Sequence, residues 1–291
     1  MDWRAIGMGL AFAVMWSSAF SSARIIVADA PPLSALALRF ALSGLIAVGL
    51  GLLYGQSWRL SARQWRSVAI FGICQNALYL GLFFVAMQSV EASLAAIIAS
   101  TMPLIAAGLG WALFGARIRL LGWAGLAAGL LGVCVILGAR ITGGADPLGL
   151  VYCGIGVAAL AVATLTVRST GSGGNLLMVV GLQMLVGGAA LLPVVLLTED
   201  HHVALSVPLV LAFSYTILVP GLAATVVWFA LVNRIGAVRA ATFHFLNPVF
   251  GVLIAALLLG ERVTLLDLLG VAIVTGGILM VQLSRAGEGT S

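Results

Sequence analysis

Two polar side chains, His244 and Asn247, lie three residues apart in a long apolar stretch, next to Pro248. Residues three apart share one face of a helix. An ionisable group inside a membrane-spanning helix is by default a hypothesis for a functional site, and histidine can exchange protons near neutral pH. The pair therefore predicts contact with a solute, and proton coupling is a further possibility. The alternative is a neutral histidine bonded to a neighbouring helix, with Asn247 joining the two helices.

Pro103 and Pro248 each interrupt the middle of an apolar run. Because proline has no N–H to donate to the carbonyl four residues earlier, Ala99 and His244 are expected to keep free backbone acceptors. Such acceptors persist at membrane depth only where protein, water or a ligand satisfies them. We therefore predict that both prolines kink their helices beside a central cavity. The alternative is a packing kink satisfied by a nearby Ser or Thr.

Further polar and aromatic side chains within apolar runs are candidates to line the same cavity. Interhelical hydrogen bonding or close helix packing is the alternative for most of them. For Arg39, binding or gating of a carboxylate is weighed against a snorkelling or structurally paired arginine. The predicted cavity residues are Trp16, Ser17, Arg39, Asn76, Tyr79, Thr101, Gln183, Trp228, His244 and Asn247.

The composition points to a chain whose solvent is lipid. Apolar residues make up 62% of the 291 residues and charged residues 8%, whereas soluble domains carry about 25% charged residues. The fourteen basic residues are all arginines dispersed in short segments, which does not indicate a nucleic-acid partner. The three cysteines fall inside apolar runs and are interpreted as small buried hydrophobic residues. We expect no metal site and no cofactor.

Ten apolar runs have the length that a membrane-spanning helix needs, which is about 20 residues. The first is too long for a cleaved signal peptide. The expected spans are 5–27, 34–54, 65–88, 93–114, 121–139, 148–169, 175–197, 207–232, 239–259 and 266–284. The sequence thus predicts an all-α integral membrane protein with ten transmembrane helices.

Proline and glycine positions recur at a spacing of 145 residues. The pairs are Pro103 and Pro248, Gly115 and Gly260, Gly125 and Gly270, and Gly132 and Gly277. This spacing predicts two copies of one unit, residues 1–144 and 145–291. Since each unit holds five helices, an odd number, the second must enter the membrane with opposite polarity. Inverted repeats recur in secondary transporters, which bind substrate near the midplane between them.

Glycines on the spans 121–139 and 266–284 predict that these two helices pack closely within the protein, away from the substrate. A contact between two copies of the chain is the alternative. We therefore expect a monomer or a weak homodimer in the lipid bilayer.

The arginines predict the orientation in the membrane, because basic residues favour the cytoplasmic side. With a cytoplasmic N-terminus, ten arginines fall in inner segments and four in outer ones. The inner ones are Arg4, Arg59, Arg63, Arg66, Arg117, Arg119, Arg168, Arg234, Arg239 and Arg285, and the outer ones are Arg24, Arg39, Arg140 and Arg262. Both termini are expected in the cytoplasm.

The segment Gly260-Glu261-Arg262-Val263, with Pro248 before it and glycines after it, resembles the EamA-type repeat of the drug/metabolite transporter superfamily. Trp16-Ser17-Ser18 and Arg39-Phe40 also resemble positions typical of that repeat, and the resemblance covers both halves. It implies export of small metabolites, often amino acids, by alternating access across a bacterial inner membrane. The related four-helix multidrug transporters carry an essential Glu in their first helix. No run here has a carboxylate at its middle, which favours zwitterionic or neutral solutes, or coupling through another group.

The expected function is therefore secondary-active transport of a small polar or amphipathic metabolite such as an amino acid, with efflux from the cytoplasm as the expected direction. No P-loop motif is present, so ATP is not the expected driver. The chain also lacks HExxH, GxSxG and GxGD motifs, so we expect no enzyme and no catalytic residues. A passive channel and an intramembrane enzyme are the alternatives.

Overall fold

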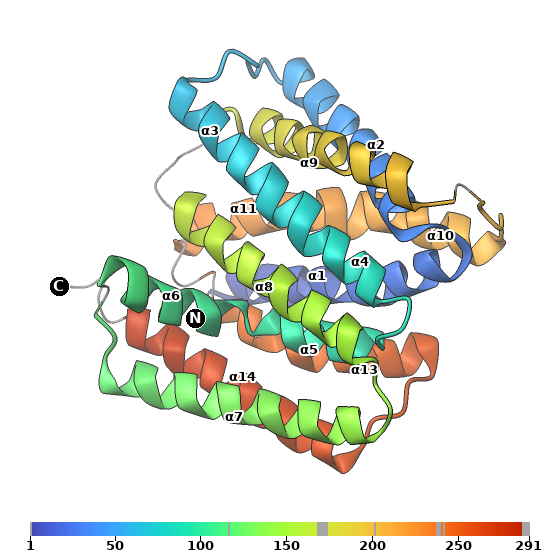
Figure 1. Ribbon diagram of the computed structural model, residues 1–291. Coiled ribbons are helices and arrows are strands. Elements are labelled where there is room, and N and C mark those ends of the chain that lie inside the picture. The colour runs from blue at the N-terminus through green and yellow to red at the C-terminus, as the bar shows by residue number, and fades with distance from the viewer. Residues whose placement is uncertain are drawn as a thin grey trace.

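The computed structural model of the protein (Figure 1) describes residues 2–115, 117–167, 174–200, 202–236, 240 and 242–286. Within these ranges the regular structure is entirely helical. Nine helical segments are long and apolar enough to span a membrane, and a shorter apolar segment covers Phe243–Leu259. The prediction of an all-α membrane protein with ten helices is confirmed.

Six spanning segments are single helices, and four are interrupted. The single helices are α1 (Trp3–Asp29), α2 (Pro32–Leu53), α7 (Leu120–Thr142), α8 (Pro147–Val167), α9 (Leu176–Thr198) and α14 (Leu265–Ala286). The third span consists of α3 (Ala62–Phe71), η1 (Gly72–Leu80) and α4 (Gly81–Ala86), and the fourth of α5 (Ala92–Ser100) and α6 (Met102–Phe114). The eighth consists of α10 (Val207–Thr216), η2 (Ile217–Ala223) and α11 (Ala224–Ile235), and the ninth of η3 (Phe243–Leu246) and α13 (Asn247–Leu259).

The third and eighth spans are each interrupted by a π-helical segment, in which an N–H bonds the carbonyl five residues earlier. The two segments begin at residues 72 and 217, the same 145-residue spacing that relates the prolines and glycines. Within η2, Pro220 cannot donate an N–H. The change of hydrogen-bond register accommodates this missing donor.

The fourth and ninth spans are interrupted by tighter turns. In the fourth span, the N–H of Thr101 donates to the carbonyl of Ile98 at 3.0 Å, and that of Leu104 to Thr101 at 2.9 Å. In the ninth, the N–H of Asn247 donates to the carbonyl of His244 within η3, a short 3₁₀ helix. The expectation that His244 keeps a free acceptor is therefore wrong, because the tighter turn supplies a donor three residues ahead.

Two glycines end equivalent helices in the two halves. Gly115 follows α6 with φ 62°, and Gly260 follows α13 with φ 67°. Glycine adopts this left-handed conformation without the steric cost that a Cβ imposes. Each of the two helices that they end is 13 residues long.

Helices α7 and α14 pack at one flank of the bundle through glycines, and they lie side by side in Figure 1. A Cβ on Gly277 would come within 2.6 Å of the backbone nitrogen of Gly129, and one on Gly132 within 3.1 Å of the carbonyl oxygen of Gly270. Residue numbers rise along α7 as they fall along α14, so the two helices are antiparallel. The prediction that these helices pack closely within the chain is confirmed.

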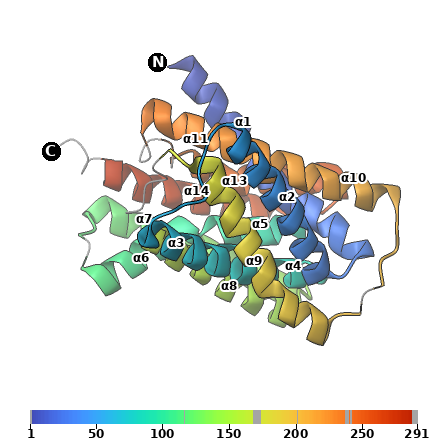
Figure 2. The ribbon, with the colours of Figure 1, turned by 90° about the horizontal axis from the view of Figure 1, so that it is seen from above.

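Helices α2 and α9 form the opposite flank, and both Figure 1 and Figure 2 show them side by side. A Cβ on Gly51 would come within 3.2 Å of the backbone nitrogen of Met178, and one on Gly188 within 3.3 Å of the carbonyl oxygen of Ala37. This pair is antiparallel too. In both pairs, one helix comes from each half and occupies the same place in the order of spans.

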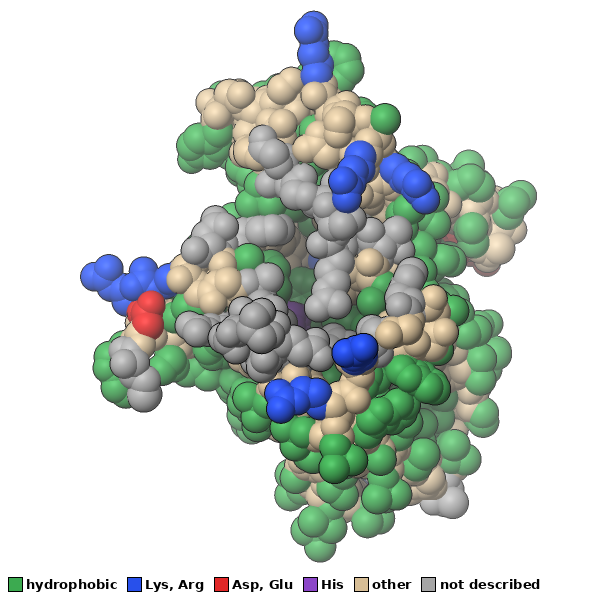
Figure 3. All heavy atoms as spheres, turned by 90° about the vertical axis from the view of Figure 1, so that its left-hand side faces the viewer, with side chains coloured by type: hydrophobic (Ala, Val, Ile, Leu, Met, Phe, Trp, Pro, Cys, Tyr) green, Lys and Arg blue, Asp and Glu red, His purple; other side chains and the backbone are tan. Residues whose placement is uncertain are grey.

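Charged side chains separate to the two ends of the bundle. The basic end carries the exposed arginines Arg4, Arg59, Arg63, Arg66, Arg117, Arg119 and Arg234, and Figure 3 shows blue side chains spread over it. There, hydrogen bonds from Arg234 lower the pKa of the Asp2 carboxyl. The acidic end carries Asp29, Glu91, Asp146, Glu199, Glu261 and Asp267.

A pair of adjacent glycines tests the packing of α7 on α14. Gly277→Ala should destabilise the protein by about 1–3 kcal/mol, because the added methyl overlaps backbone atoms of α7. Gly276→Ala is the matched control, since a Cβ there meets nothing within 4 Å. It should leave stability unchanged or raise it by up to about 1 kcal/mol through helix propensity. Thermal unfolding of both variants in detergent measures the difference, and equal midpoints would contradict the packing.

Candidate functional site

A cavity of about 50 Å³ lies inside the bundle, between α1, α2, the η1–α4 segment and η2. This volume holds a few water molecules, whereas sites for drug-sized ligands measure about 300–1,000 Å³. The site is thus closed to a metabolite in this conformation. Its walls are Trp16, Ala19, Phe20, Ala23, Arg39, Gln75, Tyr79, Leu80, Phe83, Phe84, Met87 and Pro220. We call this the central cavity.

The π-helical segment η1 decides which of its side chains reach the central cavity. Gln75 and Tyr79, four residues apart, both line it. Asn76 instead donates from Nδ2 to the carbonyl of Gln183 at 2.9 Å and thereby joins η1 to α9. Residues three apart share a face in an α-helix, but the wider turns of a π-helix shift that alignment. Of the two predicted cavity residues in η1, Tyr79 therefore lines the cavity together with Gln75, whereas Asn76 does not.

Arg39 is the one charged side chain among the described residues that wall the cavity. It lies two turns into α2, about 10 Å along the axis from Pro32, and only 6% of it is exposed. Its Nε has no hydrogen-bond partner within the described ranges, and no ion pair is formed there. A charged side chain costs about 2.5–3.5 kcal/mol at the bilayer centre on insertion scales. Arg39 neither snorkels to the surface nor pairs with a described carboxylate.

A second cluster surrounds His244 beside the central cavity. The rings of Phe12, Trp16 and Trp228 lie with centroids 5.2, 6.5 and 5.0 Å from the imidazole. Asn247 Nδ2, an amide donor, is 3.0 Å from Nδ1 of His244, which assigns the acceptor role to Nδ1. Trp16 belongs to both groups, so the cluster and the cavity share a wall.

The His244 cluster holds together four predicted residues in addition to the histidine. Besides Trp16, Trp228 and Asn247, Ser17 donates from its hydroxyl to the carbonyl of Asn247 at 3.2 Å. The Oδ1 of Asn247 is buried without a partner among the described atoms. This oxygen can accept a hydrogen bond from a bound solute or a water molecule.

Other predicted residues lie outside both groups. Thr101 donates from its hydroxyl to the carbonyl of Ile98 at 2.6 Å, and Gln183 contributes its carbonyl to Asn76. Pro103 and Pro248 are buried, but they do not wall the central cavity. Instead, α5 packs on α13, and a Cβ on Gly251 would overlap that of Ala96. The fourth and ninth spans therefore pack on each other, while the two π-interrupted spans line the cavity together with α1 and α2.

Several cavity residues were absent from the predicted set. Pro220 interrupts the run 207–232 and carries the same helix-breaking signal as the two predicted prolines. Phe83 continues the face of Tyr79 by one turn, and its ring lies 4.7 Å from that of Tyr79. For Phe20, Phe84 and Met87 the sequence offers no signal, because apolar residues of this kind fill every span.

A wider vestibule of about 660 Å³ opens at the acidic end, beside α1, α10 and α13. Arg24 lines it, and the Arg24 guanidinium donates to the carbonyl of Met87. Met87 also walls the central cavity. The contact between Arg24 and Met87 therefore lies between the vestibule and the cavity.

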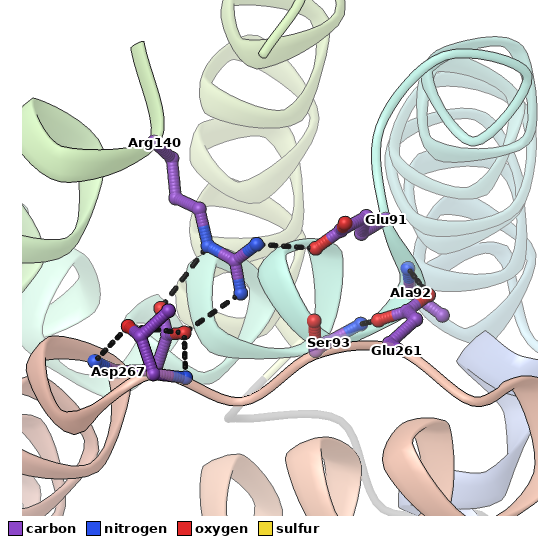
Figure 4. Close-up of polar contacts among 7 residues, drawn as sticks. Glu91, Ala92, Ser93, Arg140, Glu261 and Asp267 are labelled. Carbon is purple, nitrogen blue, oxygen red and sulfur yellow. Dashed lines mark hydrogen bonds and ion pairs between the residues drawn. The ribbon is translucent and has the colours of Figure 1, made fainter. Parts of the chain in front are cut away.

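Carboxylates at the acidic end join the two halves of the chain (Figure 4). Arg140 donates from Nε and Nη2 to Asp267 at 3.0 and 2.9 Å, and it also pairs with Glu91. Glu261 accepts from the N–H groups of Ala92 and Ser93 at the start of α5, at 2.7 and 3.0 Å. A negative charge at a helix N-terminus satisfies unpaired N–H groups and complements the helix dipole.

Glu199 caps α2 in the same way. It accepts from the N–H groups of Leu33 and Ser34 at 2.8 and 2.7 Å. The hydroxyl of Ser206 also donates to Asp29, next to the end of α1. Apart from the Arg140–Glu91 pair, these contacts connect residues 1–144 with residues 145–291. Among the described residues, no group of His, Cys, Asp and Glu has the arrangement to hold a metal ion.

Comparisons with known proteins agree with this arrangement. The EamA-like transporter family matches residues 3–138 and 147–283. The chain is 26% identical to the uncharacterized inner membrane transporter YedA of Escherichia coli K12, over 96% of this chain and 90% of that protein. It is 23% identical to the chloroplastic WAT1-related protein At3g02690 of Arabidopsis thaliana, over 94% and 68% of the two chains.

Two further comparisons extend this picture. Protein PecM of Dickeya dadantii is 24% identical over 90% of this chain and 86% of its own length. A solved crystal structure that is 23% identical superposes with a TM-score of 0.68 and covers the whole of both chains. At that identity, the solved structure shows the fold alone.

Two neighbouring residues of η1 test the division between cavity and helix packing. Asn76→Ala should lower stability by about 0.6–2 kcal/mol, because the carbonyl of Gln183 loses its side-chain donor. Gln75→Ala should leave the unfolding midpoint unchanged and alter solute transport, because Gln75 lines the cavity. Thermal unfolding and flux in proteoliposomes give the two readouts. A loss of stability in Gln75→Ala, together with altered transport but unchanged stability in Asn76→Ala, would show that the roles of the two residues are reversed.

Proposed function

Because the chain belongs to the EamA-like transporter family, we propose that it is a secondary-active carrier. It moves a small polar or amphipathic metabolite out of the cytoplasm by alternating access. The observation that carries this proposal is the closed central cavity, in which Arg39, Gln75, Tyr79 and aromatic rings are enclosed among membrane-spanning segments. A polar site enclosed at membrane depth is expected of a carrier that exposes it to each side in turn.

We further propose that residues 1–144 and 145–291 are inverted copies of one five-helix unit. The 145-residue spacing of η1 and η2 supports the duplication, as does that of Gly115 and Gly260. The antiparallel packing of α2 on α9 and of α7 on α14 supports the opposite polarity. In such carriers the substrate site lies between the repeats, and Pro220 of the second half completes a cavity whose other walls come from the first half.

The contacts at the acidic end are the seal that opens when the cavity faces that side. Arg140 with Asp267, Glu261 with α5, and Glu199 with α2 all bridge the halves. Opening this end separates the halves there, so these bonds exist in one conformation and are lost in the other. Interactions present in only one state bias the equilibrium between the two states.

The proposed orientation places the basic end in the cytoplasm. The exposed arginines shown in Figure 3 gather at that end, and basic residues favour the cytoplasmic side of a membrane. Both chain termini are then cytoplasmic, in the inner membrane of a bacterium. The acidic end faces outward, and the closed seal is the outer one.

Counterflow tests the carrier function. Purified protein in proteoliposomes should move members of a panel of radiolabelled amino acids and other metabolites. The flux should saturate, and unlabelled solute on the opposite side should accelerate it. Flux that neither saturates nor responds to solute across the membrane would identify a channel. Absence of flux for the whole panel would count against the proposal.

A cysteine in the cavity tests the seal. In a variant with Cys74, Cys134 and Cys153 replaced by Ala, Ala23→Cys places a thiol in the cavity wall, where residue 23 is 2% exposed. Adding Arg140→Gln removes the ion pair with Asp267 and should therefore favour the conformation that is open at the acidic end. Maleimide labelling in detergent should become about 5-fold faster for each kcal/mol by which the closed conformation loses stability relative to the open one. Asp2→Asn, which breaks the ion pair to Arg234 at the basic end, is the control and should not speed labelling. Equal rates in all backgrounds would exclude the seal.

A further inference from the structure

We propose that the central cavity selects organic anions, with Arg39 binding the carboxylate of a solute whose apolar body lies against the aromatic walls. This inference rests on the proposed transport function and names the class of solute. It differs from the preference for zwitterionic or neutral solutes that the sequence favours. The reason for the difference is the surroundings of Arg39.

The first argument is the balance of charge. Arg39 is buried and carries the one charge among the described walls of the cavity. A buried charge is stable when an opposite charge or hydrogen-bond acceptors surround it. Within the described part of the chain, no carboxylate meets its guanidinium, and its Nε donor is unused. A solute with a single negative group would supply the missing counter-charge.

The second argument is the supply of hydrogen-bond donors. Arg39 Nη2 and Ser43 Oγ both lie near Gly221 of η2, at 4.0 and 3.6 Å from the position that a Cβ would take there. The Ser43 hydroxyl is buried and, like Arg39 Nε, has no described partner. Tyr79, which also lines the cavity, adds a hydroxyl from η1. Donors without acceptors fit a carboxylate, which accepts hydrogen bonds and pairs with guanidinium through two parallel bonds.

The third argument concerns the rest of the solute. Phe20, Phe83 and Phe84 supply apolar and aromatic surface around the charged group. A dianion would carry a second charge that no described wall residue balances. An amino acid would bring an ammonium group, and the described walls offer it no carboxylate. The site thus favours a monocarboxylate with an aromatic or aliphatic body over an amino acid of similar size.

Ligand-induced thermal stabilisation of the full chain in detergent tests this selectivity. The probes are phenylacetate, its neutral analogue phenylacetamide, its cationic analogue phenethylamine, and the zwitterion phenylalanine. Phenylacetate should bind about 10- to 100-fold more tightly than each of the others, because it alone gives Arg39 a charge-assisted bond without an unbalanced ammonium.

Substitutions identify the group responsible. Arg39→Gln should weaken phenylacetate binding about 10- to 100-fold and leave phenylacetamide unaffected. Arg39→Lys, which keeps the charge but loses the fork of donors, should bind phenylacetate with intermediate affinity. Arg66→Gln makes the same change at an exposed site of the basic end and should bind like the unaltered protein. If Arg39→Gln does not fold, Arg39→Lys and the four probes still decide the matter.

Three results would overturn the proposal. They are equal binding of phenylacetate and phenylacetamide, unchanged binding after Arg39→Gln, and failure of phenylacetate, benzoate and octanoate alike to stabilise the protein. Proteoliposome flux separates this inference from the proposed function. Selective binding of phenylacetate without flux would refute the carrier and keep the anion site. Saturable flux of solutes with no preference for carboxylates would refute the anion site and keep the carrier.

Discussion

The hydrocarbon core of a membrane offers no water to hydrogen-bond the backbone, and this constraint shapes every interruption of the helices. Each break must be satisfied inside the protein. The third and eighth spans meet this demand with π-helical segments, and the fourth and ninth with 3₁₀-type turns. Breaks of one kind occupy equivalent places in the two halves. Only the π-helical pair borders the central cavity, so the type of break separates the helices that form the site from those that pack.

Helix faces that contain glycine pack together at the two flanks of the bundle, and the central cavity lies between these flanks. Antiparallel pairs, α2 with α9 and α7 with α14, approach until backbone meets backbone. Such surfaces tolerate no added side chain. Each pair joins one helix of the first half to one of the second, and the carboxylate contacts at the acidic end connect the same two halves. The carboxylates that cap α2 and α5 both come from the second half, whereas the two capped helices belong to the first.

Charged and buried polar side chains also occupy distinct parts of the bundle. Most exposed arginines lie at one end and most carboxylates at the other, and Arg39 lies between the two ends in the cavity wall. Other buried polar groups of these helices form local bonds: Ser18 with Tyr215, Thr216 with Ser22, and Asn76 with α9. Two of the buried groups without a described partner, Arg39 Nε and Asn247 Oδ1, lie at the cavity and in the His244 cluster. Both are suited to contact a solute.

Several features of the structure follow from the amino-acid sequence alone. They are the number of spans, the 145-residue spacing of equivalent positions, the glycine packing of α7 on α14, and the proximity of His244 and Asn247. They follow from composition and from the spacing of residues along the chain, both of which are visible in the sequence. The packing of the helices, in contrast, brings Gln75 rather than Asn76 to the cavity and places Pro220 at its border. It also leaves Arg39 without a described carboxylate partner. A π-helical turn shifts which side chains share a face, and a partner on another helix is fixed by packing. Neither can be read from local spacing.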